Sequence, residues 1–265
     1  MAKPNLADDL NLVIGSGQVL IGFEDSNGDV PNYKYRAQSA ISLSVTPETA
    51  DIPDDDTPSA EVLTTVQNQT SRGGSLTIKD WTDEMAAAFL LGSAGSYTQS
   101  STPVVDESHT ASLGSYIYVG RSSSNPAGAK NIGSVVVTDS TGTTTYSAGT
   151  DYVTSATDLA KGRIWIPASG SSISEGDDIL VDYTPAAETR SRVSSGSASA
   201  QPCWIIFESD YANGDAEEIN IPKAKLIPTG ELTLKDRENP RAMQFDIRIE
   251  TRTGYEQVYI DGEAA

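Results

Sequence analysis

Residues 243–250 read MQFDIRIE and form the most regular stretch of the chain. Every second residue is apolar and every residue between is polar. Because successive side chains of a strand point to opposite faces, this period of two predicts a strand with one buried and one solvated face. We expect residues 255–260 to return as its antiparallel partner and close a framework sheet. The apolar set is Met243, Phe245, Ile247 and Ile249, and the polar set is Gln244, Asp246, Arg248 and Glu250.

The first half of the chain shows the same alternation. Residues 18–24 (QVLIGFE) precede the turn-forming residues 26–29 (SNGD), which predicts a strand that enters a hairpin. A second alternating run carries Ile41, Leu43 and Val45. Further along, residues 203–208 (CWIIFE) precede Asn-Gly-Asp, and the strand predicted at 76–80 is answered by one at 232–236. These matches are short, so they indicate similar strands without establishing an internal duplication.

Residues 46–74 predict a long loop. They contain Pro47, Pro53, Pro58 and the acidic triplet 54–56, with one short strand expected around 62–66. The loop ends in Arg-Gly-Gly at 72–74. Loops of this length inside a domain are usually functional or disordered.

One helix is predicted after this loop. Asp80 or Thr82 can cap its start, Asp83 and Glu84 suit the positive end of the helix dipole, and Gly92 can end it. An apolar stripe at helical spacing predicts that the helix packs against the sheet. The stripe comprises Trp81, Met85, Ala88 and Phe89.

The central third of the chain differs in character. Residues 93–103 and 190–201 are rich in Ser, Gly and Thr, like paired linkers around an inserted domain. Between them, short β-prone runs with turn signals predict a small sandwich. We therefore expect a discontinuous framework domain, 1–96 with 197–265, and an inserted domain, 97–196. The runs are 116–119, 134–138, 143–146, 163–166 and 179–183.

Charge and composition exclude several classes of function. The net charge of −19 disfavours direct nucleic-acid binding, which requires cations that release counterions. The acidic surface favours solubility, or a channel through which a polyanion slides. A single cysteine, Cys203, excludes an intramolecular disulfide, and a single histidine, His109, leaves too few soft ligands for zinc. We expect no membrane span and a chain that stays in the cytosol until assembly.

No pattern of catalytic residues stands out. His109 lies in a linker-like segment, and no nucleophile elbow accompanies it. Neither 15–17 nor 72–74 has the ending of a phosphate-binding loop. The acidic groups at 54–56 and 175–178 lack the ligand spacing of an EF-hand, and we interpret 174–177 as a turn. The sequence thus favours a non-enzymatic protein without metal, cofactor or small-molecule substrate.

Several segments, in this order, resemble the major tail tube proteins of siphophages. They are the strand at 21–24, the exit at 45–49 into the acidic loop, the helix start at 80–84 and residues 217–235. The inserted third resembles the immunoglobulin-like modules of phage structural proteins through residues 149–153, 162–166 and 173–183.

This resemblance implies two packed antiparallel sheets with one flanking helix, assembled as hexameric rings that stack into a tube. Closing sheets across subunits would remove exposed sheet edges. The long loop would contact a neighbouring subunit or ring, and the acidic residues of the 243–250 strand would line a lumen that conducts DNA; Arg248 on the same face argues against that lining. The expected contact residues are Glu48, Asp54, Asp55, Asp56, Val62, Val66 and Arg72, and the expected lumen residues are Asp246 and Glu250.

The implied partners are other copies of the chain and the tape-measure, tail terminator and distal tail proteins. Double-stranded DNA would pass through without specific binding, and the protein would reside in the virion tail after assembly in the host cytoplasm. Two alternatives stay open. One is another virion structural or decoration protein, and the other is a carbohydrate-binding β protein that uses Trp81, Trp165 or Trp204 as a stacking platform. Of these, only Trp165 is a fair candidate, although a position in a sandwich core is the favoured interpretation.

Overall fold

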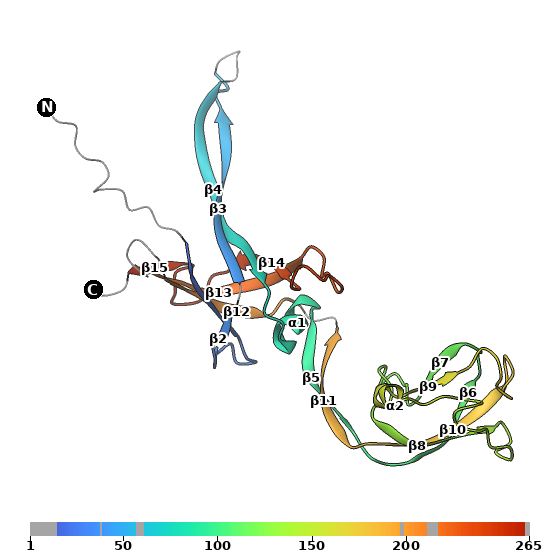
Figure 1. Cartoon of the computed structure of the whole chain (residues 1–265). Coiled ribbons are helices and arrows are strands. Elements are labelled where there is room, and N and C mark those ends of the chain that lie inside the picture. The colour runs from blue at the N-terminus through green and yellow to red at the C-terminus, as the bar shows by residue number, and fades with distance from the viewer. Residues whose placement is uncertain (1–14, 38, 57–60, 197–198, 211–216, 263–265) are drawn as a thin grey trace. The chain divides into compact units, whose positions relative to one another are not determined.

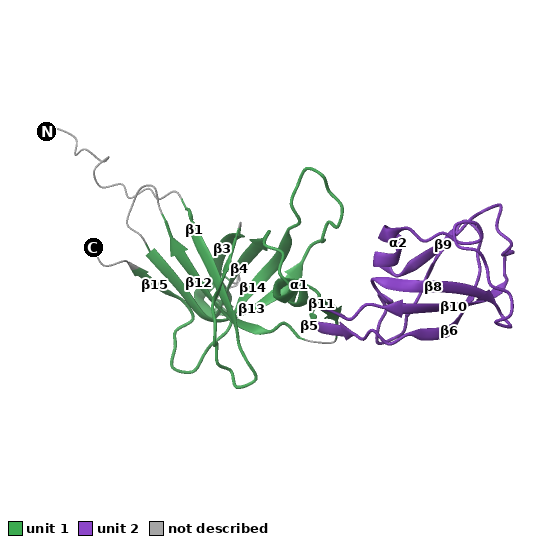
Figure 2. Cartoon of the chain, turned by 60° about the horizontal axis from the view of Figure 1, so that its bottom comes forward, with its two compact units in different colours: residues 1–95, 192–265 green, residues 96–191 purple. Residues whose placement is uncertain are grey.

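The computed structural model describes residues 15–37, 39–56, 61–196, 199–210 and 217–262. Over these residues the chain is mainly β with two short helices, which confirms the predicted class. It forms two compact units, a split unit of residues 1–95 and 192–265 and an inserted unit of residues 96–191 (Figure 2). The sequence analysis placed the two boundaries at 96/97 and 196/197.

A continuous eight-stranded sheet forms the split unit (Figure 1). The strand order is β2-β1-β12-β13-β14-β4-β3, and β15 also pairs with β13. The resemblance implied two packed sheets. One hydrogen-bonded sheet occurs instead, because the long strand β13 pairs with β12, β15 and β14 along its length. The strands are β1 (Gly17–Phe23), β2 (Lys34–Arg36), β3 (Ser39–Pro53), β4 (Val62–Ile78), β12 (Pro202–Ser209), β13 (Glu217–Thr229), β14 (Met243–Ile249) and β15 (Tyr259–Gly262).

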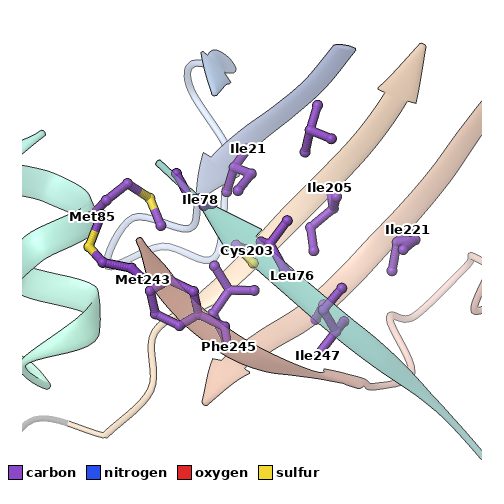
Figure 3. Close-up of a cluster of buried hydrophobic side chains, with 13 residues drawn as sticks. Ile21, Leu76, Ile78, Met85, Cys203, Ile205, Ile221, Met243, Phe245 and Ile247 are labelled. Atoms are coloured by element: carbon purple, nitrogen blue, oxygen red, sulfur yellow. The ribbon is translucent and has the colours of Figure 1, made fainter. Parts of the chain in front are cut away.

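The sheet curls around a single apolar core (Figure 3). Val19 and Ile21 of β1 share this core with Leu76 and Ile78 of β4, although the two strands are far apart in the strand order. Only a strongly curved sheet brings such strands together. Curvature of this kind follows from the right-handed twist of strands.

Strand β14 has the two faces that its sequence predicts. Met243, Phe245 and Ile247 are each 1% exposed, and the polar residues between them lie on the outer face. The expected partner strand is different, however: β15 pairs with β13, while β14 lies between β13 and β4. The strand expected at 232–236 does not form, and Leu234 is 67% exposed there.

Helix α1 (Asp83–Phe89) packs on the core. The Thr82 hydroxyl caps it by accepting the Met85 N–H at 3.3 Å. The helix buries Met85, and Phe89 meets Phe245 edge to face with ring centroids 5.8 Å apart. Trp81 precedes the helix and is 44% exposed, so its predicted place in the packing stripe is wrong.

Each of the two stretches interpreted as linkers starts in a two-stranded ribbon that β5 (Gly92–Gln99) and β11 (Glu188–Ser195) form. Gly92 opens β5, after Leu91 has left the helix with a φ of 48°. A Cβ at Gly92 would lie 1.9 Å from the Ser194 carbonyl oxygen, so close strand approach requires glycine here.

The inserted unit has a core of its own between two small ladders, β6-β10-β8 and β7-β9. Of the five predicted runs, residues 143–146 contribute only an isolated bridge between Thr138 and Thr145. The strands are β6 (Val104–Thr110), β7 (Ser115–Tyr118), β8 (Ile132–Asp139), β9 (Arg163–Ile166) and β10 (Asp178–Pro185).

A second helix, α2 (Ala156–Lys161), was not predicted. Ser155 caps its start by accepting the Asp158 N–H at 3.1 Å. Gly162 ends it in the left-handed region with a φ of 68°. Both signals are present in the sequence, but the helix has only six residues and no apolar periodicity.

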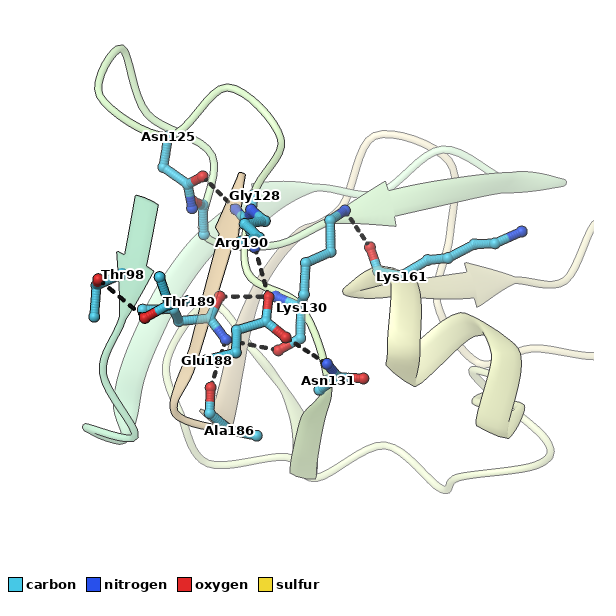
Figure 4. A network of polar contacts seen from close by, with 12 residues as sticks. Thr98, Asn125, Gly128, Lys130, Asn131, Lys161, Ala186, Glu188, Thr189 and Arg190 are labelled. Atoms are coloured by element: carbon cyan, nitrogen blue, oxygen red, sulfur yellow. Dashed lines mark hydrogen bonds and ion pairs between the residues drawn. The ribbon is translucent and has the colours of Figure 1, made fainter. Parts of the chain in front are cut away.

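Within the inserted unit, a network of polar contacts holds the residues at the two ends of its segment together (Figure 4). The Gln99 side chain, which is 7% exposed, donates to the carbonyls of Lys130 and Ala186 at 2.8 and 2.7 Å. Its oxygen accepts the Lys130 N–H at 3.0 Å. Arg190 forms an ion pair of 2.8 Å with Glu188 beside it. Because the buried amide has its partners, burial carries no penalty for missing hydrogen bonds.

Candidate functional site

The most distinctive feature of the split unit is the long hairpin of β3 and β4, which we call the arm. Near its base, residues 73–78 of β4 pair with β14 as well as with β3. Beyond the Val45–Arg72 pair the two strands continue as a ribbon that has only itself as a partner among the described residues. Figure 1 shows this ribbon projecting from the rest of the sheet.

The prediction of a long loop at residues 46–74 is wrong, because the arm occupies this segment. Residues 46–53 and 62–74 are paired strand, and the expected short strand at 62–66 is only the start of β4. The loop was predicted partly because Pro47 and Pro53 disfavour a strand. Both lie on β3, which has a partner on one side only, and an edge strand tolerates residues without an N–H.

Apolar side chains of the arm are exposed. On β4, Val62 is 57%, Leu63 66% and Val66 43% exposed, and on β3, Val45 is 62% and Ile52 45% exposed. Two register irregularities, after Glu48 and Ile52, change the twist of the ribbon near these residues. An isolated two-stranded ribbon in water is marginally stable, so these side chains favour a covering partner.

The acidic residues follow the end of β3. The Asp54 N–H donates to the Glu61 carbonyl at 2.7 Å, and the Asp56 N–H donates to the Asp54 carboxylate at 3.0 Å. Asp55 and Asp56 are exposed. These residues place negative charge at the described end of the arm.

The remaining contact candidates lie along the arm. Glu48 pairs with Gln69 halfway out and is exposed. Arg72 lies at the base and donates to the Gln257 side chain at 2.6 Å, which links the arm to the segment before β15. The structure thus places all seven contact candidates on one hairpin, spread over its whole length.

The two lumen candidates lie on the outer face of the sheet, opposite the core. Asp246 is on β14, and Glu250 follows that strand. Glu250 forms an ion pair of 2.7 Å with Lys225, and Lys223 lies at 3.8 Å from the same carboxylate. With Arg248 also exposed, this face carries both signs of charge instead of the acidic surface that we expected.

The curled sheet contains an open pocket of about 730 Å³, which is lined by apolar side chains such as Ile205 and Ile221. Arg36 lies in its wall and is 2% exposed. Its guanidinium contacts Glu84 at 2.6 Å and Thr82 at 3.3 Å, while its Nε has no hydrogen-bond partner among the residues that the structure describes. Nothing in the strand sequence Lys34–Arg36 distinguishes this residue, so sequence reasoning missed it.

The described residues bring together none of the candidate metal ligands of the sequence. No group of three or more His, Cys, Asp or Glu side chains there is placed to hold a metal ion. His109 lies in β6, partly buried against Glu107 at 2.9 Å, and not in a solvated linker as predicted. Residues 174–177 form the expected turn, in which the Asp177 carboxylate accepts the Ser174 N–H at 2.7 Å.

The three tryptophans lie on surfaces. Trp81 has the Arg241 guanidinium 5.2 Å from its ring, and Trp204 lies between Tyr33 and Tyr255 on the outer face of β12. Trp165 was interpreted as a core residue, and this is wrong. Its neighbours on β9, Ile164 and Ile166, are the buried ones, so Trp165 faces outward.

The fold therefore defines a mainly β, two-unit protein whose candidate site is a protruding β-ribbon. Residues 12–251 match the family described as "Protein of unknown function UCP028589", and the chain belongs to that family. No curated protein matches the chain. Among the described residues, no helix is long and apolar enough to span a membrane.

Proposed function

We propose that this chain is the structural subunit of a bacteriophage tail tube, which self-assembles into stacked, hexameric rings. The observation that carries the proposal is the arm, a paired ribbon with exposed apolar side chains and an acidic end. The resemblance of the framework segments to siphophage tail tube proteins supports the same assignment. No catalytic role is proposed.

The arm has the properties of an assembly element. Its apolar residues would lose their contact with water on docking, and each fully buried Val or Leu side chain contributes about 1.5–3 kcal/mol. Its register is fixed at the base, where β14 holds residues 73–78 and the Ser42 and Ser75 hydroxyls bond at 2.8 Å. Because the base is held in this way, it sets the direction of the ribbon. The part of the arm beyond the Val45–Arg72 pair can then adapt to a neighbouring subunit.

The sheet edges support assembly as well. β2 and β3 are the two ends of the strand order, and no other described strand pairs with the outer side of the 15 residues of β3. Long unpaired edges promote association between chains. In a ring, the edge of one subunit would pair with the next, so that the sheets close into a barrel around a lumen.

The charge of the chain suits a conduit for DNA. A net charge of −19 repels phosphate, so DNA would pass through without being captured. Asp246 and Glu250 remain the proposed lumen residues, with the ion pair between Glu250 and Lys225 reducing the local negative charge. Other copies of the chain and the tape-measure, terminator and distal tail proteins are the proposed partners, and the virion tail is the proposed location.

Shortening the arm tests the proposal. We would delete residues 48–69 and join Pro47 to Thr70, which face each other in the register, through an Asn-Gly turn. The variant should keep the circular dichroism spectrum and thermal transition of the wild type, because the core lies in the sheet. It should form no rings or tubes in electron micrographs. Tubes that grow as in the wild type would overturn the role of the arm.

A further inference from the structure

A row of aromatic and cationic side chains occupies the outer face of the β7-β9 ladder in the inserted unit. Tyr116 is opposite Trp165, and Tyr118 is opposite Arg163 in the antiparallel register. The inward residues of both strands are isoleucines in the core, so these four side chains share the solvent face. We call them, together with Arg121 and Lys130, the aromatic-cationic row.

The row is tightly ordered. The Arg163 guanidinium lies 3.8 Å from the Tyr116 ring centroid, and the Arg121 guanidinium lies 4.1 Å from that of Tyr118. Tyr116 and Trp165 pack with ring centroids 4.7 Å apart. Each such cation–π contact stabilises the arrangement by about 0.5–1 kcal/mol at exposed sites. The side chains are therefore held in place before any ligand arrives.

Positive charge is concentrated around this row. Residues 96–191 contain ten acidic residues and only five basic ones, and three of the five lie within 6 Å of the Tyr118 ring centroid. These are Arg121, Lys130 and Arg163. The Arg163 guanidinium, which hydrogen-bonds the Tyr118 hydroxyl, and the other two cations hold the pKa of Tyr118 below its usual value.

Not all of this charge is neutralised within the unit. Arg163 forms an ion pair of 2.8 Å with Asp158, so it serves mainly to order the row. Arg121 is exposed, and within the described residues it has no carboxylate partner. Among the described residues, the Lys130 ammonium hydrogen-bonds the Lys161 carbonyl at 2.8 Å and forms no ion pair (Figure 4). Two cations are thus available to an outside anion.

We propose that the aromatic-cationic row binds an acidic polysaccharide whose sugar units carry carboxylates. The rings of Tyr116 and Trp165 would take the apolar face of a sugar, and Arg121 and Lys130 would bind its carboxylate. The planar guanidinium suits a carboxylate because two parallel hydrogen bonds can form. This inference concerns the inserted unit alone and does not depend on the tube proposal.

Charge and size favour this ligand over others. Two available cations are few for a nucleic acid, whose affinity depends on cations placed at several phosphates. A neutral glycan would leave the cations unused. The ladder has only four residues per strand, about 13 Å in length, which is short for a protein interface of roughly 800 Å² per partner.

Titration of the full chain with polygalacturonate tests the proposal, with a neutral dextran and a double-stranded DNA oligonucleotide as comparisons. Isothermal titration calorimetry would measure the binding. We expect polygalacturonate to bind, and dextran and DNA not to bind. The charge reversal R121E/K130E should weaken polygalacturonate binding at least tenfold. W165L, which keeps an apolar side chain on the strand, should weaken it as well, and both variants should remain folded, with a single cooperative melting transition.

K235E is the matched control, because Lys235 is an exposed lysine of the split unit and lies outside the row. It should bind like the wild type. The proposal is overturned if the wild type does not bind polygalacturonate, if DNA or dextran binds equally well, or if K235E loses as much affinity as R121E/K130E. Unchanged binding by W165L would also overturn it, because charge alone would then account for the affinity.

Discussion

Replacing the exposed apolar side chains of the arm by threonine should prevent assembly and leave the subunit folded. The triple variant V62T/L63T/V66T keeps residues that favour strands, and the three side chains are 57%, 66% and 43% exposed in the single chain. Surface changes of this kind alter the stability of the subunit by less than about 0.5 kcal/mol each. The Thr65 hydroxyl would keep its 2.7 Å hydrogen bond to Asp51 across the ribbon.

Assembly should respond much more strongly. Losing part of this apolar burial and burying a hydroxyl in its place together cost about 1 kcal/mol per position. A total of about 3 kcal/mol corresponds to a roughly 100-fold higher concentration for assembly. Sedimentation and light scattering across a dilution series would measure it. L234T, at a residue with 67% exposure outside the arm, is the control. An unchanged assembly concentration for the triple variant, or an equal rise for L234T, would refute the reasoning.

Three further predictions concern stability and reactivity. Gly74→Ala would place a Cβ 1.9 Å from the Ser42 carbonyl oxygen and should destabilise the split unit by about 1–3 kcal/mol in urea titrations; an unchanged midpoint would contradict this. Hydrogen bonds from the backbone N–H groups at residues 144 and 143 lower the pKa of Asp139 to about 2, so its stabilising contribution is present above pH 4 and is lost as the pH falls to 2. The melting temperature of D139N should therefore lie below that of the wild type at pH 7, with the difference closing towards pH 2, and a pH-independent difference would count against it. Burial raises the pKa of the Cys203 thiol, so a thiol reagent should label it only as the protein unfolds, not rapidly in the native state.

Alternating patterns in the sequence predicted the inner face of the framework. The period of two in residues 243–250 gave the buried residues of β14, because a strand against one core has no other way to separate apolar from polar side chains. The start of α1 was likewise predicted by Thr82, whose hydroxyl bonds a free N–H of the first turn. Pairing was harder to predict. β15 joined β13 and not β14, since partner choice depends on contacts distant in sequence.

The segment of the candidate site was predicted as a loop, and the structure shows a paired hairpin there. Pro47 and Pro53 indicate a loop when only local propensity is considered, and only the open edge of β3 explains why they occur in a strand. Trp165 was assigned to the core because a lone tryptophan among strand residues is usually buried. Its outward direction follows from the burial of Ile164 and Ile166, and a sequence that alternates two kinds of apolar residue does not reveal which kind faces the core.

Electron microscopy of the purified, full-length protein at rising concentration tests the central claim most directly. Hollow tubes of stacked rings should appear above a threshold concentration, and the shortened-arm variant alone should form none. A monodisperse monomer at every concentration, with no rings or tubes, would contradict the account.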